Sequence, residues 1–328
     1  MPGVALCRAG RADMTMAGCK MKRNASESGM PGTAEETSLP YGSQAEQAME
    51  KTDEMNDAAA IQNASDGEIA AIARAYERYF ASGFYDQRYP RHNAQSLATI
   101  LQVGREARAI LDFGCGDGRY VLPLLHTTGA RIFAYDICPV ALKSLERRIA
   151  NEPARDRVQT ILGPREDYTE GAPVDLALIM FGVLGHIPGR ANRVATLRRI
   201  RDLLTQQGSG NLVVSVPNAA RRFRLEQQEH KAALAAGQPR PPAREDGDIL
   251  YSRAHDGERI ELFYHLYSPA MLAGELRDAG FRNVRMQAES VWPESGVTRS
   301  ATLATFDRLL RSVTPPGLGY GILATAEA

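Results

Sequence analysis

The sequence predicts an α/β fold built on a doubly wound, mostly parallel sheet. Short apolar runs end in polar or glycine-rich turns and alternate with segments of helical period, which is the pattern of repeated βαβ units. The first run, residues 109–111, leads into Asp112 and three glycines before a helical pattern begins. A later run, residues 174–181, is apolar almost throughout, as expected of a central strand that is buried on both faces.

The turn after the first strand contains glycine at every second position, at Gly114, Gly116 and Gly118. A backbone that bends sharply and also lies against a ligand has no room for a Cβ atom and often needs a positive φ. Dinucleotide-binding turns have the spacing G-x-G-x-x-G, and the last of those positions is Arg119 here. The spacing therefore weakens the case for a nicotinamide or flavin cofactor.

A second strand, residues 131–135, stops at Asp136, about twenty residues past the glycines. A carboxylate at this place can accept both ribose hydroxyls of an adenosine-containing ligand. With its order of strand, D-x-G-x-G-x-G turn, helix, strand and terminal acid, the chain resembles the class I S-adenosylmethionine-dependent methyltransferases over residues 65–328.

This resemblance implies a Rossmann-like fold, with seven strands and an antiparallel strand at the sheet edge, and S-adenosylmethionine as cofactor. Asp167 lies past the third strand, near the place where the family binds adenine, although Glu166 competes for that role. Phe181 opens the turn at residues 181–187, where the family places the edge of the methyl-transfer pocket. The expected cofactor-binding residues are Asp112, Gly114, Cys115, Gly116, Gly118, Asp136, Ile137, Asp167 and Phe181.

His186 is the candidate general base, because its unperturbed pKa lies near neutrality. A structural contact is the competing interpretation of this histidine. The implied mechanism is direct displacement at the methyl group, which requires no metal and no covalent intermediate. A base is needed only for a hydroxyl or protonated amine acceptor.

Two further segments are candidates for the acceptor site. Residues 84–93 belong to an expected N-terminal helical lid (residues 65–105), and they either cover the cofactor or pack a helix pair onto the sheet. Residues 219–265 form an insertion in which Asp256-Gly257 marks a hairpin. The substrate-binding candidates are Tyr85, Arg88, Tyr89, Tyr251, Arg253, Tyr264 and His265.

We expect a small-molecule acceptor, and two alternatives are kept. Residues 263–268 resemble a run in tRNA wobble-uridine carboxymethyl methyltransferases, and arginines at 190, 193, 198, 199 and 201 on one helix could contact phosphates or simply keep that helix solvated. Against RNA, both Lys plus Arg and Asp plus Glu total 39, so no global positive field exists. The other alternative is a non-catalytic S-adenosylmethionine-binding protein. The methylated atom and the oligomeric state are not predicted.

Residues 1–64 have no sustained apolar period, so we expect a disordered tail. A transit peptide, or a true start at Met49 or Met55, are the two explanations of this tail. The four cysteines form no C-x-x-C pair, and we expect neither a metal site nor disulfides, as in a reducing cytoplasm. No apolar run approaches the roughly twenty residues of a membrane span, so no membrane contact is expected.

Overall fold

The structure is a computed structural model, and it describes residues 67–328 apart from positions 166, 206, 207, 209 and 256. The expected disordered tail therefore lies outside the described residues, as do Ser65, Glu166 and Asp256.

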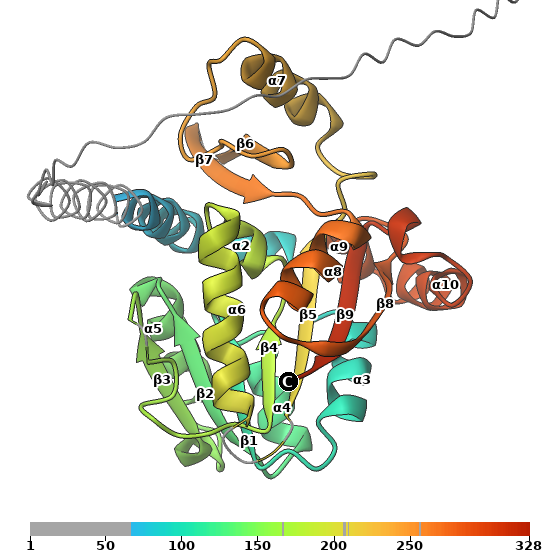
Figure 1. Cartoon of the computed structure of the whole chain (residues 1–328). Helices are drawn as coiled ribbons and strands as arrows, with labels where there is room; N and C mark the ends of the chain where they lie inside the picture. Colours follow the sequence, from blue (N-terminus) through green and yellow to red (C-terminus); the bar gives the residue numbers. More distant parts are fainter. Residues whose placement is uncertain (1–66, 166, 206–207, 209, 256) are drawn as a thin grey trace, which may run out of the picture. The chain divides into compact units, whose positions relative to one another are not determined.

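One seven-stranded sheet forms the centre of the described chain (Figure 1). Its strands lie in the order β3 (Val158–Leu162), β2 (Arg131–Asp136), β1 (Ala109–Phe113), β4 (Leu176–Ile179), β5 (Asn211–Pro217), β9 (Gly321–Glu327) and β8 (Arg282–Ser290). Strands β1 to β5 pair in parallel, and β9 runs antiparallel to both of its neighbours. This arrangement confirms the predicted fold class, and the antiparallel pair β8–β9 closes one edge of the sheet.

Helices cover both faces of this sheet. On one face lie α3 (Ala94–Val103), α4 (Val121–Thr127) and α5 (Pro139–Ile149), and on the other lie α6 (Arg190–Thr205) and α8 (Pro269–Asp278). Successive side chains of a strand point to opposite faces. Ile110 of β1 therefore packs with the first group of helices, whereas Leu111 packs with the second.

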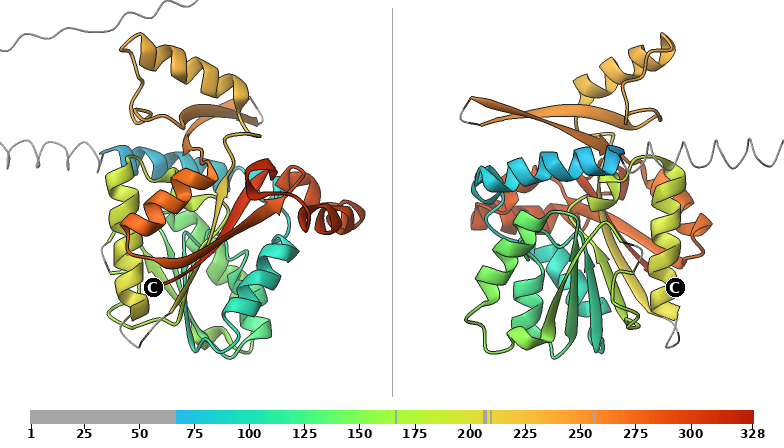
Figure 2. Two further views of the ribbon diagram at one scale, coloured as in Figure 1. Left: turned by 45° about the vertical axis from the view of Figure 1, so that its right-hand side comes forward. Right: turned by 90° about the vertical axis from the view of Figure 1, so that its left-hand side faces the viewer.

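A separate two-stranded hairpin, β6 (Asp248–His255) and β7 (Glu258–His265), lies beyond the carboxyl ends of the parallel strands with α7 (Arg224–Ala235). Its strands bracket the predicted turn. A helix at residues 67–81 runs between this hairpin and the sheet (Figure 2). Tyr79 of the helix is buried with Ile249 and Leu262 of the hairpin in one apolar cluster. The carboxyl edge of the sheet is thus covered by two layers.

The expected lid at residues 65–105 is divided between two roles. Asn93 caps α3, and its side chain accepts hydrogen bonds from the amides of Gln95 and Ser96. Ile100 of α3 is fully buried against the sheet, so this helix belongs to the core. The part that covers the carboxyl edge is the helix at 67–81 and the short α2 (Phe84–Arg88).

The remaining elements are the 3-10 turns η1 (Arg155–Arg157), η2 (Val183–His186) and η3 (Pro316–Leu318) and the helices α9 (Glu294–Val297) and α10 (Ala301–Arg311). Strand β4 is shorter than predicted, because Phe181 leaves the extended conformation with a φ of 61°. Within the described part of the chain, no helix has both the length and the apolar character needed to cross a membrane.

Candidate functional site

The glycine turn after β1 requires each of its three glycines. Gly114, Gly116 and Gly118 have φ angles of 76°, 57° and 86°, which strain any other residue. A Cβ atom at Gly114 or Gly118 would also lie 2.4 Å from a neighbouring side-chain carbon. At Gly116 it would lie 3.3 Å from Cζ of Phe80, near the end of the covering helix. Gly116 is therefore the glycine that faces the covered carboxyl edge.

Asp136 joins the end of β2 to this turn. Its carboxylate accepts hydrogen bonds from the amides of Gly116 (2.7 Å) and Cys138 (2.8 Å). Burial raises its pKa to about 6, against the lowering effect of these amides. Each carboxylate oxygen has a second acceptor site, so Asp136 can still accept hydroxyl donors from a ligand.

Asp112 is buried, with 2% of its surface exposed, and its Oδ2 has no hydrogen-bond partner among the described residues. Burial and, secondly, the charge of Asp136 raise the pKa of Asp112 to about 7. A buried acceptor without a donor is unfavourable, and a ligand that brings an ammonium or hydroxyl group would satisfy it. This orphaned oxygen indicates that the turn fits a ligand with a donor at that point.

Arg119 occupies an aromatic box formed by Tyr85, Tyr89 and Phe181. Its guanidinium carbon lies 4.9, 5.4 and 4.5 Å from the three ring centroids, respectively. One guanidinium nitrogen donates to the carbonyl of Arg91 (3.0 Å), whereas Nε has no hydrogen-bond partner in the described structure. The three rings are predicted site residues, whereas Arg119, which is 8% exposed, was not predicted from the sequence.

A cavity of about 540 Å³ lies beside the aromatic box. Its lining includes Tyr89 and Arg119 of the box and two carboxylates, Asp86 and Asp117. Asp117 also pairs with Arg148. Burial and the nearby charge of Asp117 raise the pKa of Asp86. The cavity therefore holds acidic groups close enough to repel each other.

A buried carboxylate pair, which was not predicted from the sequence, consists of Glu289 near the end of β8 and Glu294 at the start of α9. Ser96 donates a hydrogen bond to Glu289 (2.9 Å), and Oε1 of Glu294 has no hydrogen-bond partner among the described residues. Within that same part of the chain, neither carboxylate forms an ion pair within 4.0 Å. Burial and the charge of Glu294 raise the pKa of Glu289 to about 8. The only sequence signal was an acidic residue at the carboxyl end of a strand.

The contacts of His186 make it a poor candidate for the general base. Its Nδ1 donates to the carbonyl of Phe263 (2.8 Å), and the Tyr76 hydroxyl donates to Nε2 (2.5 Å). Its ring stacks on Tyr264 at 4.3 Å. Burial, aided by the charge of Arg222, lowers its pKa to about 4. The histidine thus links the helix at 67–81 and the hairpin to the turn after β4.

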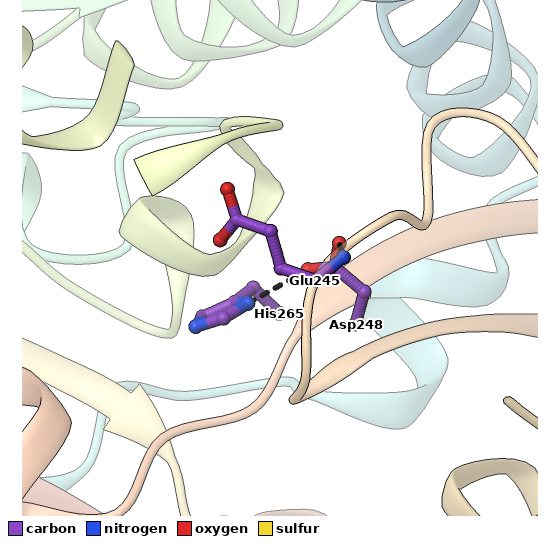
Figure 3. Close-up of side chains that lie close together, drawn as sticks. All are labelled: Glu245, Asp248 and His265. Atoms are coloured by element: carbon purple, nitrogen blue, oxygen red, sulfur yellow. Dashed lines mark hydrogen bonds and ion pairs between the residues drawn. The ribbon is translucent and has the colours of Figure 1, made fainter. Parts of the chain in front are cut away.

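The structure corrects the expectation that His265 contacts a substrate. Its side chain is 0% exposed, and Nδ1 donates to Asp248 (2.7 Å) (Figure 3). The guanidinium of Arg193 lies 3.3 Å from its Nε2 and pairs with Glu275 (2.7 Å) and Glu245 (2.9 Å). Arg193 is therefore buried rather than exposed on α6. Ligand atoms of Glu245, Asp248 and His265 lie within 4.8 Å of one another, but Arg193 already supplies the cation.

The other predicted cofactor residues differ in their placement. Cys115 is buried in the turn, and Ile137 is partly buried against the core. Asp167 is exposed, and its carboxylate accepts from the amides of Thr169 and Gly171 (both 3.0 Å) within its own turn. These amide bonds lower its pKa, although its slight desolvation acts the other way. An acid that is satisfied in its own turn is less suited to binding adenine.

The remaining acceptor-side candidates lie together at the hairpin. Tyr251 and Tyr264 are buried, with centroids 5.9 Å apart, and the guanidinium carbon of Arg253 lies 4.6 Å from the Tyr251 ring. Arg222, which the sequence analysis did not identify, lies 5.5 Å from the ring of Tyr264. Arg88 instead donates to the Tyr89 hydroxyl (3.0 Å) beside the aromatic box.

The sheet order, the glycine turn after β1 and the buried acid after β2 define a class I methyltransferase. The chain belongs to the family described as "Methyltransferase domain", which matches residues 85–286, more than half of its length. It is an S-adenosylmethionine-dependent methyltransferase, since this family takes its methyl group from that cofactor.

Comparison with individual proteins finds either a short matching segment or low sequence identity. A segment of 62 residues is 45% identical to ribosomal RNA small subunit methyltransferase C of Marinomonas sp. (strain MWYL1), and it covers 19% of this chain and 18% of that protein. The CcbJ methyltransferase from Streptomyces caelestis is 16% identical, with a TM-score of 0.47 over 74% of this chain and 88% of that one. The 1,6-didemethyltoxoflavin-N1-methyltransferase of Burkholderia thailandensis is 23% identical, with a TM-score of 0.47 over 78% and 88%.

Proposed function

We propose that this enzyme methylates a small-molecule acceptor held between the carboxyl edge of the sheet and the hairpin β6–β7. The main support for this proposal is that the helix at 67–81 and the hairpin enclose the carboxyl edge of the sheet, where the acceptor would lie. The aromatic residues Tyr79, Tyr251 and Tyr264 are buried by the packing of the covering helix against the hairpin. A buried, mainly apolar site with a few polar groups suits a small ligand.

The arginines of α6 support this choice over tRNA. Arg190 pairs with Asp278, and Arg193 is buried in its ion-pair cluster. Arg198 and Arg201 donate to the backbone carbonyls of Asp278 and Ala279. RNA recognition relies on positive groups directed at phosphates. These four arginines instead fasten α6 to α8.

For the cofactor we propose roles for the residues at the carboxyl ends of β1, β2 and β4. Asp136 would accept the ribose hydroxyls, and the unpaired oxygen of Asp112 would accept from the ammonium of the amino acid part. Gly116 would leave space for the ligand backbone, while Phe181 would border the methyl group. Ile137 and Cys115 would line the same pocket.

The bound sulfonium supplies an electrophilic methyl group. The chain then has to position the acceptor and exclude water, a proximity effect that can contribute several kcal/mol. We propose Glu289, in place of His186, as the group that takes a proton from the acceptor. Its carboxylate is bonded by Ser96 and by Ser215 at the end of β5, and it lies close enough to Arg222 to feel that charge. Burial and the charge of Glu294 raise its pKa to about 8, which suits proton transfer near neutral pH.

The test is methyl transfer from S-adenosylmethionine labelled in its methyl group, with separate pools of small molecules and of tRNA from a cell extract. We expect label in small molecules, and much less label with the Asp136→Ala variant at the same cofactor concentration. Label in tRNA would overturn the proposed substrate class. Tight cofactor binding without transfer to either pool would favour the non-catalytic alternative.

We also propose a cytoplasmic location. Cys115 and Cys138 are both free thiols, and both are buried beside the residues assigned to the cofactor. Free structural thiols are typical of reducing compartments. Cell fractionation with an antibody against the chain tests this location, and recovery in a secreted or periplasmic fraction would contradict it.

A further inference from the structure

We propose that the aromatic box of Tyr85, Tyr89 and Phe181 is the binding site for the sulfonium centre of the cofactor, and that Arg119 fills it as an internal cation that has to leave before binding. The inference rests on the proposed cofactor site and names a subsite within it. Its ligand class is a compact cation without hydrogen-bond donors.

The box already binds a cation. The Arg119 guanidinium lies within 5.4 Å of all three ring centroids, inside the range at which aromatic faces attract positive charge. The rings of Tyr89 and Phe181 meet edge to face at 4.7 Å, and Tyr85 meets Tyr89 at 5.7 Å. The three rings therefore form one continuous wall that suits a positive charge of small size.

The box also lies where a sulfonium would be needed. Arg119 directly follows Gly118 of the glycine turn, and Phe181 begins the turn after β4. Phe80, whose ring tip faces Gly116, packs on Tyr85 at 4.4 Å. The box is thus bounded by the cofactor turn on one side and by the turn that leads to the acceptor side on the other.

Arg119 is held weakly for a buried cation. Among the described residues its guanidinium donates one hydrogen bond, to the Arg91 carbonyl, and its Nε has no partner. Within this part of the chain it forms no ion pair within 4.0 Å. The carboxylates of Asp117 and Glu294 attract the guanidinium only from beyond that distance, so the protein replaces little of the hydration that Arg119 loses on burial. A sulfonium has no hydrogen-bond donors and needs no acceptors. Burial in the same box therefore costs it less lost hydrogen bonding than it costs a guanidinium.

The structure offers a place for the displaced side chain. The adjacent cavity of about 540 Å³ is lined by Arg119 itself and by the carboxylates of Asp86 and Asp117. These two acids lie close enough that the charge of Asp117 raises the pKa of Asp86. A guanidinium that turns into this cavity would come closer to Asp86 and to Asp117, which it would share with Arg148.

Such an exchange would discriminate between cofactor and product. S-adenosylmethionine carries the positive sulfonium and competes with Arg119 for the box. S-adenosylhomocysteine has a neutral thioether, so the guanidinium can return after methyl transfer and weaken product binding. The enzyme would therefore prefer cofactor to product, which limits product inhibition.

The experiment is calorimetric titration of the full-length protein with S-adenosylmethionine and, separately, S-adenosylhomocysteine. We expect the parent to bind the cofactor at least tenfold more tightly than the product. Tyr89→Leu should reduce this ratio about tenfold by weakening cofactor binding, while Tyr89→Phe, which keeps the ring, should preserve it. Arg119→Gln should tighten product binding, whereas the exposed Arg105→Gln should leave both affinities unchanged.

The outcomes separate the proposals. If neither compound binds, the cofactor site itself is wrong. Equal affinities in the parent, or an equal loss of both in Tyr89→Leu, would overturn the sulfonium subsite. If Arg119→Gln binds the product no more tightly than the parent, Arg119 is not an internal competitor. Thermal unfolding verifies each fold, and Phe181→Leu replaces Tyr89→Leu should the latter not fold.

Discussion

The hydroxyl oxygen of Ser215 accepts a hydrogen bond from the backbone amide of Phe181 across 2.7 Å. The carbonyl of the same serine accepts from the amide of Gly182 (3.0 Å). Phe181 has a φ of 61°, a conformation that costs a bulky residue about 1–3 kcal/mol. The end of β5 thus holds the turn after β4 in the strained form that aims the Phe181 ring into the aromatic box.

The Ser215→Ala variant should therefore lose both stability and cofactor affinity. It leaves the Phe181 amide unpaired, which costs roughly 1–3 kcal/mol, and it releases a ring of the box. Denaturant unfolding and calorimetry with S-adenosylmethionine measure the two losses. Ser312→Ala, at an exposed position after α10, is the control and should change stability by about 0.5 kcal/mol or less. Equal behaviour of the two variants would contradict the role given to Ser215.

Asp136→Ala should weaken S-adenosylmethionine binding by roughly 1.5–3 kcal/mol, the range for hydrogen bonds to a charged group. It also removes the acceptor of the Gly116 and Cys138 amides, so the turn loses order before any ligand binds. Calorimetry measures the affinity, and Asp156→Asn, whose side chain is 92% exposed, provides the unaffected control. Parental affinity in a folded Asp136→Ala protein would refute the assignment of the ribose acid.

The sequence predicted those parts of the fold that local pattern determines. Strand β3 (Val158–Leu162) and helix α6 (Arg190–Thr205) follow the predicted alternation of strands and helices, because each element has a sustained apolar period and clear breaks at both ends. Asp136 and the glycines could be identified for the same reason, since their function depends on spacing along one βαβ unit.

The charged residues at the centre of the site could not be predicted in this way. Arg193 looks like the exposed arginines around it, and its burial depends on Glu275, 82 residues further along the chain. Glu289 is bonded by Ser96, 193 residues away. Arg119 is enclosed by rings from two other segments. A charged side chain is buried when partners far along the chain pair with it. The apolar periodicity of a single helix or strand does not indicate such partners.

The pH dependence of stability should show the titration of Asp112. Its folded pKa of about 7 lies above the ordinary aspartate value of 3.8, so its contribution to stability is fully present below about pH 4 and is lost as the pH rises to about 7. That difference corresponds to roughly 4 kcal/mol. Asp136 and Glu289 titrate in the same direction, so comparison with Asp112→Asn isolates this one group.

Denaturant unfolding of the ligand-free protein between pH 4 and 8 provides the measurement. The parent should lose more stability over this range than Asp112→Asn. Binding of S-adenosylmethionine should strengthen more over the same range in the parent than in Asp112→Asn, because the ionised Asp112 carboxylate attracts the ammonium. A pH profile that is identical in both proteins would show that Asp112 does not titrate there.

Glu289→Gln should separate stability from activity. Removing one of two buried like charges should stabilise the protein above pH 8, where the Glu289 carboxyl is otherwise ionised. Loss of a general base should lower the rate of methyl transfer about 10²–10⁴-fold, with cofactor affinity nearly unchanged. Glu294→Gln should instead shift the rising limb of the pH–rate profile to lower pH, since it removes the charge that raises the pKa of Glu289. An active Glu289→Gln enzyme would require another base, or none.

The Arg193 cluster provides the last prediction. Arg193→Met leaves Glu275 and Glu245 without their shared cation, and breaking a buried ion pair costs about 3–5 kcal/mol. The ligand atoms of Glu245, Asp248 and His265 are close enough to accept Zn²⁺ in place of the guanidinium. Thermal unfolding with and without Zn²⁺ should therefore show stabilisation of Arg193→Met and none of the parent. The Arg190→Met variant, which breaks an exposed pair on the same helix, should lose little stability and gain none from Zn²⁺. Stabilisation of the parent by Zn²⁺ would show that the cluster is a metal site after all.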